Sequence, residues 1–149
     1  MSALSHLKIL ELAEGVAGEY CGKLLADFGA QVIKLERPVI GSPTRRLGPF
    51  VAEGPEGERS GLFAYLNSNK ASVELDVTSP TSADTLRRLF DSVDAVIDDH
   101  GPGWLRDIGL DPQSCEAQRP GLVLCSITPF GQDAAGDRRH AEDLTLIHA

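Results

Sequence analysis

Apolar residues along this chain form short runs typical of strands, separated by stretches with helical spacing. Strands are expected at 7–12, 31–37, 72–77, 94–99 and 122–128. Helices are expected at 20–29, 79–93, 112–120 and 140–149, with a short helix or turn at 61–70. Strands that alternate with helices predict an α/β fold, here a Rossmann-like, doubly wound and mostly parallel sheet of about five strands.

The spacing of apolar residues also indicates which helix faces are shared. In 20–29 the residues on one face are Cys21, Leu24, Leu25 and Phe28, and Gly29 ends the helix. In 79–93 the residues expected to point inward are Leu86, Leu89, Phe90 and Val93. That helix is expected to begin with Ser79 as the N-cap and Pro80 at the first position.

The segment 38–59 differs from the rest because it is rich in glycine, proline and charge. No regular element is expected in it, and it is either a binding loop or a mobile one. It contains Arg45–Arg46, and a second Gly-rich loop contains Arg138–Arg139. Both pairs are candidate anion contacts, although exposed arginine pairs are usually only solvated.

Composition limits the class of protein. The 149 residues are 42% apolar, which suits one domain with a real core, and the net charge of -8 argues against a nucleic acid partner. Three cysteines without CxxC spacing and four scattered histidines predict neither disulfides nor a metal site. Without a long apolar run or a secretory signal, no membrane association is expected, and the chain is predicted to be soluble and cytoplasmic.

Polar residues at the ends of predicted strands are the candidate chemistry. Glu36 and Arg37 follow the second strand, where ligands bind in open α/β sheets; Arg37 is a candidate phosphate or carboxylate contact, or the two form an exposed pair. His100 is either a ligand contact or a solvated loop residue. Asp143 is a candidate acid or only a first-turn residue favoured by the helix dipole. No GxGxxG pattern is present, so NAD binding is weakly supported, and without a Walker lysine motif a P-loop nucleotide hydrolase is set aside.

An ordered set of segments resembles one family. These are LKILELAEGVAGEYCGKLLADFGAQVIKLERP, GSPTRRLGPF, LNSNKASVELDV, GPGWLRDIGL, RPGLVLCSITPFGQ and AEDLTLIHA. From Leu7 to Ala149, their order and spacing are similar to those of the family III CoA-transferases, which include formyl-CoA transferase, carnitine CoA-transferase and α-methylacyl-CoA racemase.

The resemblance implies that residues 1–149 are the amino-terminal, Rossmann-like part of a CoA-transferase large domain. It implies coenzyme A or an acyl-CoA as the ligand and no metal. By position, the CoA contacts would be Gly15, Val16, Arg37, Leu75, Asp99, His100 and Gly101. Arg37 would face the phosphates of CoA as a charged donor, and Glu36 would orient the loop that follows. The family also implies an interlocked homodimer, or a partner chain that supplies the rest of the enzyme.

The resemblance implies transfer of CoA between carboxylic acids through aspartyl anhydride and aspartyl-CoA thioester intermediates. The family's nucleophilic aspartate lies downstream of the helix matched by EDLTLIHA, so the isolated chain is expected to lack it and to be inactive. No residue is therefore assigned a catalytic role, Asp143 included. Glu142 stands where the family's racemases carry histidine, so a racemase relative is less favoured. The alternatives are a non-catalytic CoA-binding or assembly subunit, and a nucleotide-binding domain of unrelated chemistry.

Overall fold

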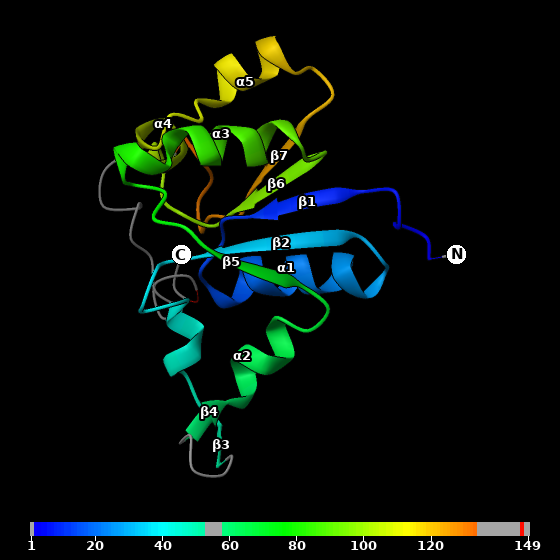
Figure 1. Ribbon diagram of the computed structural model, residues 1–149, viewed down its shortest axis with the longest axis vertical. Helices are drawn as coiled ribbons and strands as arrows, with labels where there is room; N and C mark the ends of the chain where they lie inside the picture. Colours follow the sequence, from blue (N-terminus) through cyan, green and yellow to red (C-terminus); the bar gives the residue numbers. More distant parts are fainter. Residues whose placement is uncertain (1, 53–57, 134–146, 148–149) are drawn as a thin grey trace.

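The core of the protein is a sheet of five parallel strands (Figure 1). The computed structural model describes residues 2–52, 58–133 and 147. The strands are β1 (Lys8–Glu11), β2 (Gln31–Glu36), β5 (Ala71–Glu74), β6 (Ala95–Asp98) and β7 (Val123–Ser126), and their order in the sheet is β5-β2-β1-β6-β7. The chain moves outward from β1 in one direction and then returns to β6 on its other side. The predicted Rossmann-like α/β fold is confirmed.

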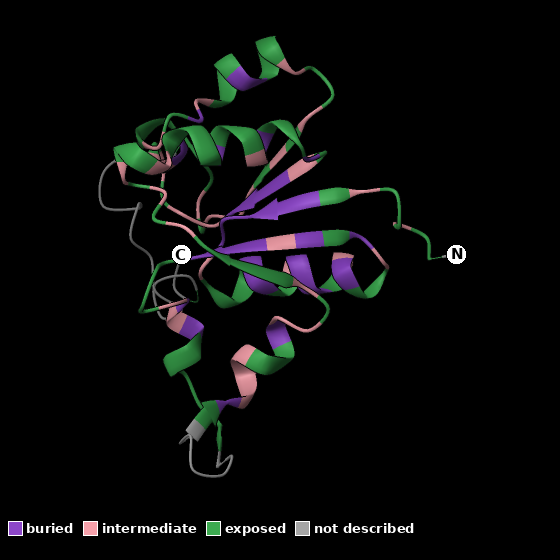
Figure 2. Cartoon of the chain, viewed as in Figure 1, coloured by how far each residue is buried: buried purple, intermediate pink, exposed green. Residues whose placement is uncertain are grey.

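Helices cover both faces of this sheet (Figure 1). α1 (Val16–Asp27) lies on one face, and α3 (Ala83–Asp91), α4 (Trp104–Asp107) and α5 (Pro112–Gln118) lie on the other. Each face has its own buried apolar cluster, and the central strands β1 and β6 are buried along most of their length (Figure 2). Within the described ranges, no helix is long and apolar enough to cross a membrane.

On the α3 side of the core, the residues that point inward are those predicted from the apolar spacing. Leu86, Phe90 and Val93 are buried and Leu89 packs against them. The start of the helix differs, because Ser79 and Pro80 lead into a single 3-10 turn, η3 (Pro80–Ser82), before the α-helix begins at Ala83.

The buried face of α1 agrees only in part with the one that the apolar spacing predicts, because Cys21 and Leu25 pack against the apolar cluster on this side of the sheet. Leu24 and Phe28 are 41% and 59% exposed, whereas the buried positions are Gly18, Glu19, Gly22, Lys23 and Ala26. The face toward the sheet is therefore mixed: small and polar residues meet charged side chains of the strands, and Cys21 and Leu25 meet the apolar cluster. Gly29 ends the helix as predicted, with a backbone φ of +98° that favours glycine.

The prediction that segment 38–59 holds no regular element was wrong. It contains a 3-10 helix, η1 (Pro43–Arg46), and the strands β3 (Phe50–Ala52) and β4 (Glu58–Ser60), which pair as an antiparallel hairpin ahead of α2 (Gly61–Leu66). The hydroxyls that hold η1 bind a carboxylate from α1, a long-range contact that local composition does not reveal. The residues between β6 and α5, for which no helix is predicted, likewise contain α4. The helix expected at 140–149, Arg138–Arg139, Glu142 and Asp143 lie outside the described residues.

Four buried charges join the elements around α1. The side chains of Glu11 on β1, Glu19 on α1, Lys34 on β2 and Lys70 before β5 are each at most 1% exposed. Lys34 Nζ lies 2.9 Å from Glu19 Oε1 and 3.2 Å from Glu11 Oε1, and Lys70 Nζ lies 2.7 Å from Glu11 Oε2. We call these four side chains the buried ion cluster. Its two positive and two negative charges balance, as a buried group of ions requires.

Hydrogen bonds extend the buried ion cluster to η1 and α2. Ser42 and Thr44 donate hydroxyl hydrogen bonds to the Glu19 carboxylate, and Asn67 donates an amide hydrogen bond to it. Lys70 also donates to the backbone oxygen of Glu19 at 2.7 Å. Burial raises the pKa of Glu11 and lowers that of Lys70, and in each case the opposite charge of its partner works against the shift.

Glycine at position 22 lets α1 approach this cluster. A Cβ atom there would lie 1.7 Å from Glu11 Oε2, which is backed by Lys70. Gly22→Ala is therefore expected to lower the free energy of unfolding by about 2 kcal/mol, even after a helix-propensity gain of about 1 kcal/mol. Urea unfolding measures this. Gly121→Ala, where nothing lies within 4 Å of the added atom, is the control and should change stability by less than about 0.5 kcal/mol. Equal effects of both variants would contradict the close approach.

Removing one cation should leave a buried carboxylate without compensation. Lys70→Met is expected to lower the free energy of unfolding by about 3–5 kcal/mol, measured by urea unfolding. The double variant Lys70→Met with Glu11→Leu should recover part of this loss, because Lys34 and Glu19 still pair. The exposed Lys8→Met is the control for charge alone. A double variant that is less stable than the sum of its single changes would argue against the pairing.

Candidate functional site

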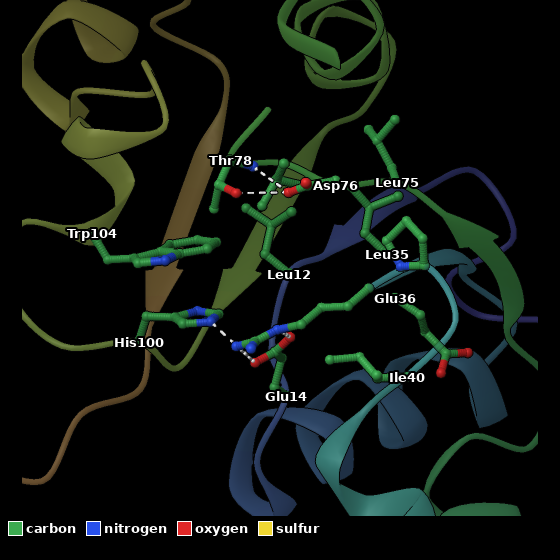
Figure 3. Close-up of a pocket in the computed structure, with 13 residues that line it drawn as sticks. Leu12, Glu14, Leu35, Glu36, Ile40, Leu75, Asp76, Thr78, His100 and Trp104 are labelled. Atoms are coloured by element: carbon green, nitrogen blue, oxygen red, sulfur yellow. Dashed lines mark hydrogen bonds and ion pairs between the residues drawn. The ribbon is translucent and has the colours of Figure 1, made fainter. Parts of the chain in front are cut away.

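A cavity of about 360 Å³ opens at the carboxyl ends of β1, β2, β5 and β6 (Figure 3). In parallel sheets this edge carries the loops that bind ligands, and the cavity lies beside β1, where the chain reverses its direction across the sheet. The residues that line it are Leu12, Glu14, Leu35, Glu36, Arg37, Pro38, Ile40, Leu75, Asp76, Val77, Thr78, His100 and Trp104.

One wall of the cavity is aromatic. The rings of His100 and Trp104 are stacked, with centroids 3.6 Å apart and planes 5° apart (Figure 3). Apolar side chains from three strand ends, including Leu12, Leu35 and Leu75, form the floor. A flat, partly polar group is the kind of ligand part that such a surface accepts.

A chain of charged contacts runs along the cavity. Arg37 donates from Nε and Nη2 to the two oxygens of Glu14, at 2.6 and 2.5 Å. The other neighbour of Glu14 is His100, whose Nε2 lies 3.6 Å from Glu14 Oε2 (Figure 3). His100 Nδ1 in turn lies 2.7 Å from Asp98 Oδ1. Two cations therefore alternate with two carboxylates along one side of the site.

These contacts change the titration of the groups involved. Burial lowers the pKa of His100, but the hydrogen bonds and charges of Asp98 and Glu14 outweigh it and raise the pKa to about 9. Burial raises the pKa of Glu14, but His100 and Arg37 outweigh it and leave the pKa below its usual value. At neutral pH His100 is therefore a cation and Glu14 an anion.

Glu36 does not pair with Arg37, although the two are adjacent in sequence. Its carboxylate is turned away from Glu14 and His100 (Figure 3) and accepts two hydrogen bonds from Arg45, at 2.6 and 2.8 Å. It also accepts from the backbone N–H of Ser42 and the hydroxyl of Ser72. Burial raises the pKa of Glu36, but these donors outweigh it and lower the pKa to about 2. The exposed Glu36–Arg37 pair is thus excluded, and Glu36 contacts the loop that follows it.

The residues predicted from the sequence separate into three groups. Arg37, Leu75 and His100 line the cavity. Asp99 and Gly15 lie beside the cavity in the turns after β6 and β1, where the Asp99 carboxylate accepts from the backbone N–H groups of Glu14 and Gly15 at 2.9 and 2.7 Å. Val16 and Gly101 are exposed and outside the lining. The structure therefore brings three of the predicted side chains together and gives Asp99 a contact to the backbone beside the cavity.

Sequence reasoning missed Glu14 and Trp104, which form much of the polar and aromatic surface. Glu14 comes three residues after β1, so the strand-end rule that selected Arg37 applies to it equally. Trp104 lies four residues after His100, and its stacking depends on the one-turn helix α4. Arg45, a candidate anion contact, is already paired with Glu36. Among the described residues, no group of three or more metal-ligating side chains comes together.

The pattern that defines CoA-transferase family III matches residues 4–149. This chain belongs to CoA-transferase family III. The succinate–glutarate CoA-transferase of Agrobacterium fabrum is 40% identical over 131 residues, which cover 87% of the chain. The human succinyl-CoA:glutarate CoA-transferase is 33% identical over 141 residues, which cover 94% of it.

A solved structure agrees with this assignment. A CaiB/BaiF family protein from Brucella suis superposes with a TM-score of 0.83 over 97% of this family III chain, at 35% sequence identity. The matched part is 38% of that structure, 33% of the Agrobacterium relative and 31% of the human relative. The chain therefore spans about a third of the length of the curated relatives it matches.

The charged contacts of His100 predict a pH dependence of stability. The folded pKa of about 9 lies above the ordinary value of 6.5, so the stabilisation is complete below pH 6.5 and is lost as the pH rises through 9. Between pH 6.5 and 9.5, the free energy of unfolding measured in urea should fall by about 2 kcal/mol more for the wild type than for the variant His100→Gln. An imidazole pKa below 7 in an NMR titration would contradict the contacts with Asp98 and Glu14.

Proposed function

We propose that this chain is the CoA-binding part of an enzyme that moves CoA between carboxylic acids, and that the cavity beside Arg37 holds part of the CoA molecule. The observation that carries the proposal is the joint presence of an arginine and an aromatic wall at the sheet edge of a family III chain. The relatives bear the names of transferases that use succinyl-CoA or formyl-CoA, which supports a thioester of a small acid as the substrate class.

The two sides of the cavity suit the two kinds of group in CoA. The apolar and aromatic wall offers a surface for a flat ring, and Arg37, with its side chain 56% exposed, offers donors to a phosphate. At about 360 Å³ the cavity is near the lower end of the roughly 300–1,000 Å³ of small-molecule sites. It therefore suits one end of CoA, with the rest of the ligand running along the loop edge.

In this proposal the described residues bind and orient the ligand rather than react with it. Arg37 and His100 supply positive charge, and Asp99 fixes the turn after β1 through two backbone N–H groups. The hydrogen bonds that Arg45 and the backbone N–H of Ser42 donate to Glu36 hold the loop that supplies Pro38 and Ile40 to the cavity wall. We assign no nucleophile among the described residues. The three cysteines are free thiols, which is consistent with the cytoplasm as the proposed compartment.

A second function, as an assembly subunit that binds CoA without catalysis, is favoured by the exposed side of α1. Large apolar side chains recur there every four residues and are between 41% and 59% exposed: Val16, Tyr20, Leu24 and Phe28. Tyr65, 54% exposed, stacks beside Tyr20 with ring centroids 6.5 Å apart. Such a stripe supports association with a second copy or a partner chain. Light scattering measures the mass in solution, and transfer of CoA from succinyl-CoA to glutarate, followed by chromatography, separates an enzyme from a binding module.

Titration of CoA into the chain by calorimetry tests the proposed site. We expect binding, and Arg37→Ala should weaken it by about 1.5–3 kcal/mol, because a charged hydrogen bond to phosphate is lost. Arg87→Ala, an exposed arginine on α3 outside the cavity, is the matched control and should bind as the wild type does. Absence of CoA binding by a well-folded chain would refute the proposal. Equal affinity for CoA and for simple adenine nucleotides would favour a nucleotide-binding domain of other chemistry.

A further inference from the structure

Glu14 occupies the donors that a ligand phosphate would use. The Nε and Nη2 groups of Arg37 donate to its carboxylate, and the Nε2 atom of His100 faces it at 3.6 Å. The other ring nitrogen of His100 is engaged by Asp98 at 2.7 Å. A ligand anion that binds the Nε–Nη2 edge of Arg37 and the Nε2 atom of His100 together must therefore take the place of the Glu14 carboxylate.

We propose that Glu14 is a specificity-determining residue, an internal counter-anion that a phosphate of the incoming ligand displaces from Arg37. The proposal rests on the proposed CoA-binding function and adds to it the group against which the ligand competes. Glu14 then weakens the binding of every anionic ligand, and only a ligand that also gains contacts with the apolar wall offsets this cost.

The local geometry allows this exchange without a change of fold. The backbone of Glu14 is anchored because its N–H donates to Asp99 at 2.9 Å. Only the side chain has to move, by rotation about its own bonds. Arg37 is 56% exposed, whereas Glu14 is 16% exposed, so a ligand reaches the guanidinium from solvent while the carboxylate lies behind it. The exchange replaces one bidentate anion of Arg37 with another.

The other carboxylates that line the cavity are occupied elsewhere. Glu36 is paired with Arg45, and Asp76 accepts from the backbone N–H and the hydroxyl of Thr78 (Figure 3). Of the described carboxylates, Glu14 contacts both Arg37 and His100. It is consequently the one at which a single neutral substitution releases the Nε–Nη2 edge of Arg37 and the Nε2 atom of His100 for a ligand.

Calorimetric titration of CoA into Glu14→Gln tests the proposal. The glutamine keeps the size of the side chain but removes its charge. The dissociation constant for CoA should therefore fall about tenfold. This change is small compared with the full interaction expected between two charges a few ångströms apart. Adenosine, which has no phosphate, should bind the variant and the wild type equally. Glu116→Gln, an exposed carboxylate on α5, is the control for net charge and should leave CoA binding unchanged. In Glu14→Gln with Arg37→Gln, the gain should disappear.

The outcomes separate this inference from the proposed function. CoA binding that is unchanged or weaker in a folded Glu14→Gln chain would overturn the inference and leave the CoA site standing. No CoA binding by either form would overturn both. A measurement on the wild type needs no variant: carbon-13 NMR should show that bound CoA raises the pKa of Glu14, because the carboxyl loses Arg37. A Glu14 pKa that stays low with CoA bound would refute the displacement.

Discussion

The buried ion cluster is the interaction on which the arrangement of this domain depends. Four charges with almost no exposure are stable only when each meets an opposite charge at short distance, so the four elements that carry them have fixed relative positions. Glu19 extends this constraint through the hydroxyls of Ser42 and Thr44 to η1. A polar interface between α1 and the sheet therefore specifies where the first turn and the following loop lie.

The cavity is a consequence of that arrangement. The loop after β2 is fixed by two contacts, from Thr44 to Glu19 and from Arg45 to Glu36. The same loop supplies Pro38 and Ile40 to the cavity wall. On the opposite side, Asp99 ties the turn after β6 to the turn after β1. The charged side chains of the site thus project from turns that are held by carboxylates, rather than from unrestrained loops.

Charge balance is the common feature of the structural and the functional regions. In the ion cluster the balance is complete and sealed from solvent, which suits a permanent contact. In the cavity the charges in the series of contacts from Arg37 through Glu14 and His100 to Asp98 are also balanced. Arg37 is more than half exposed, however, so the proposed exchange of partners takes place where solvent and ligand have access. An overall acidic protein can in this way present a local pair of cations to an anionic ligand.

The sequence by itself determined the parallel sheet, the inward face of α3 and the strand end that carries Arg37, because apolar period and strand-end position are local properties. It also carried enough ordered motifs to indicate the family. It determined only part of the buried face of α1, Cys21 and Leu25, because spacing rules assume an apolar interface and part of this one is ionic. The partners of Glu36 lie up to 36 positions from it, Trp104 lies 4 positions from His100, and His100 lies 86 positions from Glu14. Only the tertiary structure brings those side chains within contact distance, because the carboxyl ends of the neighbouring parallel strands β1, β2 and β6 lie at one sheet edge, and this decides which charges meet.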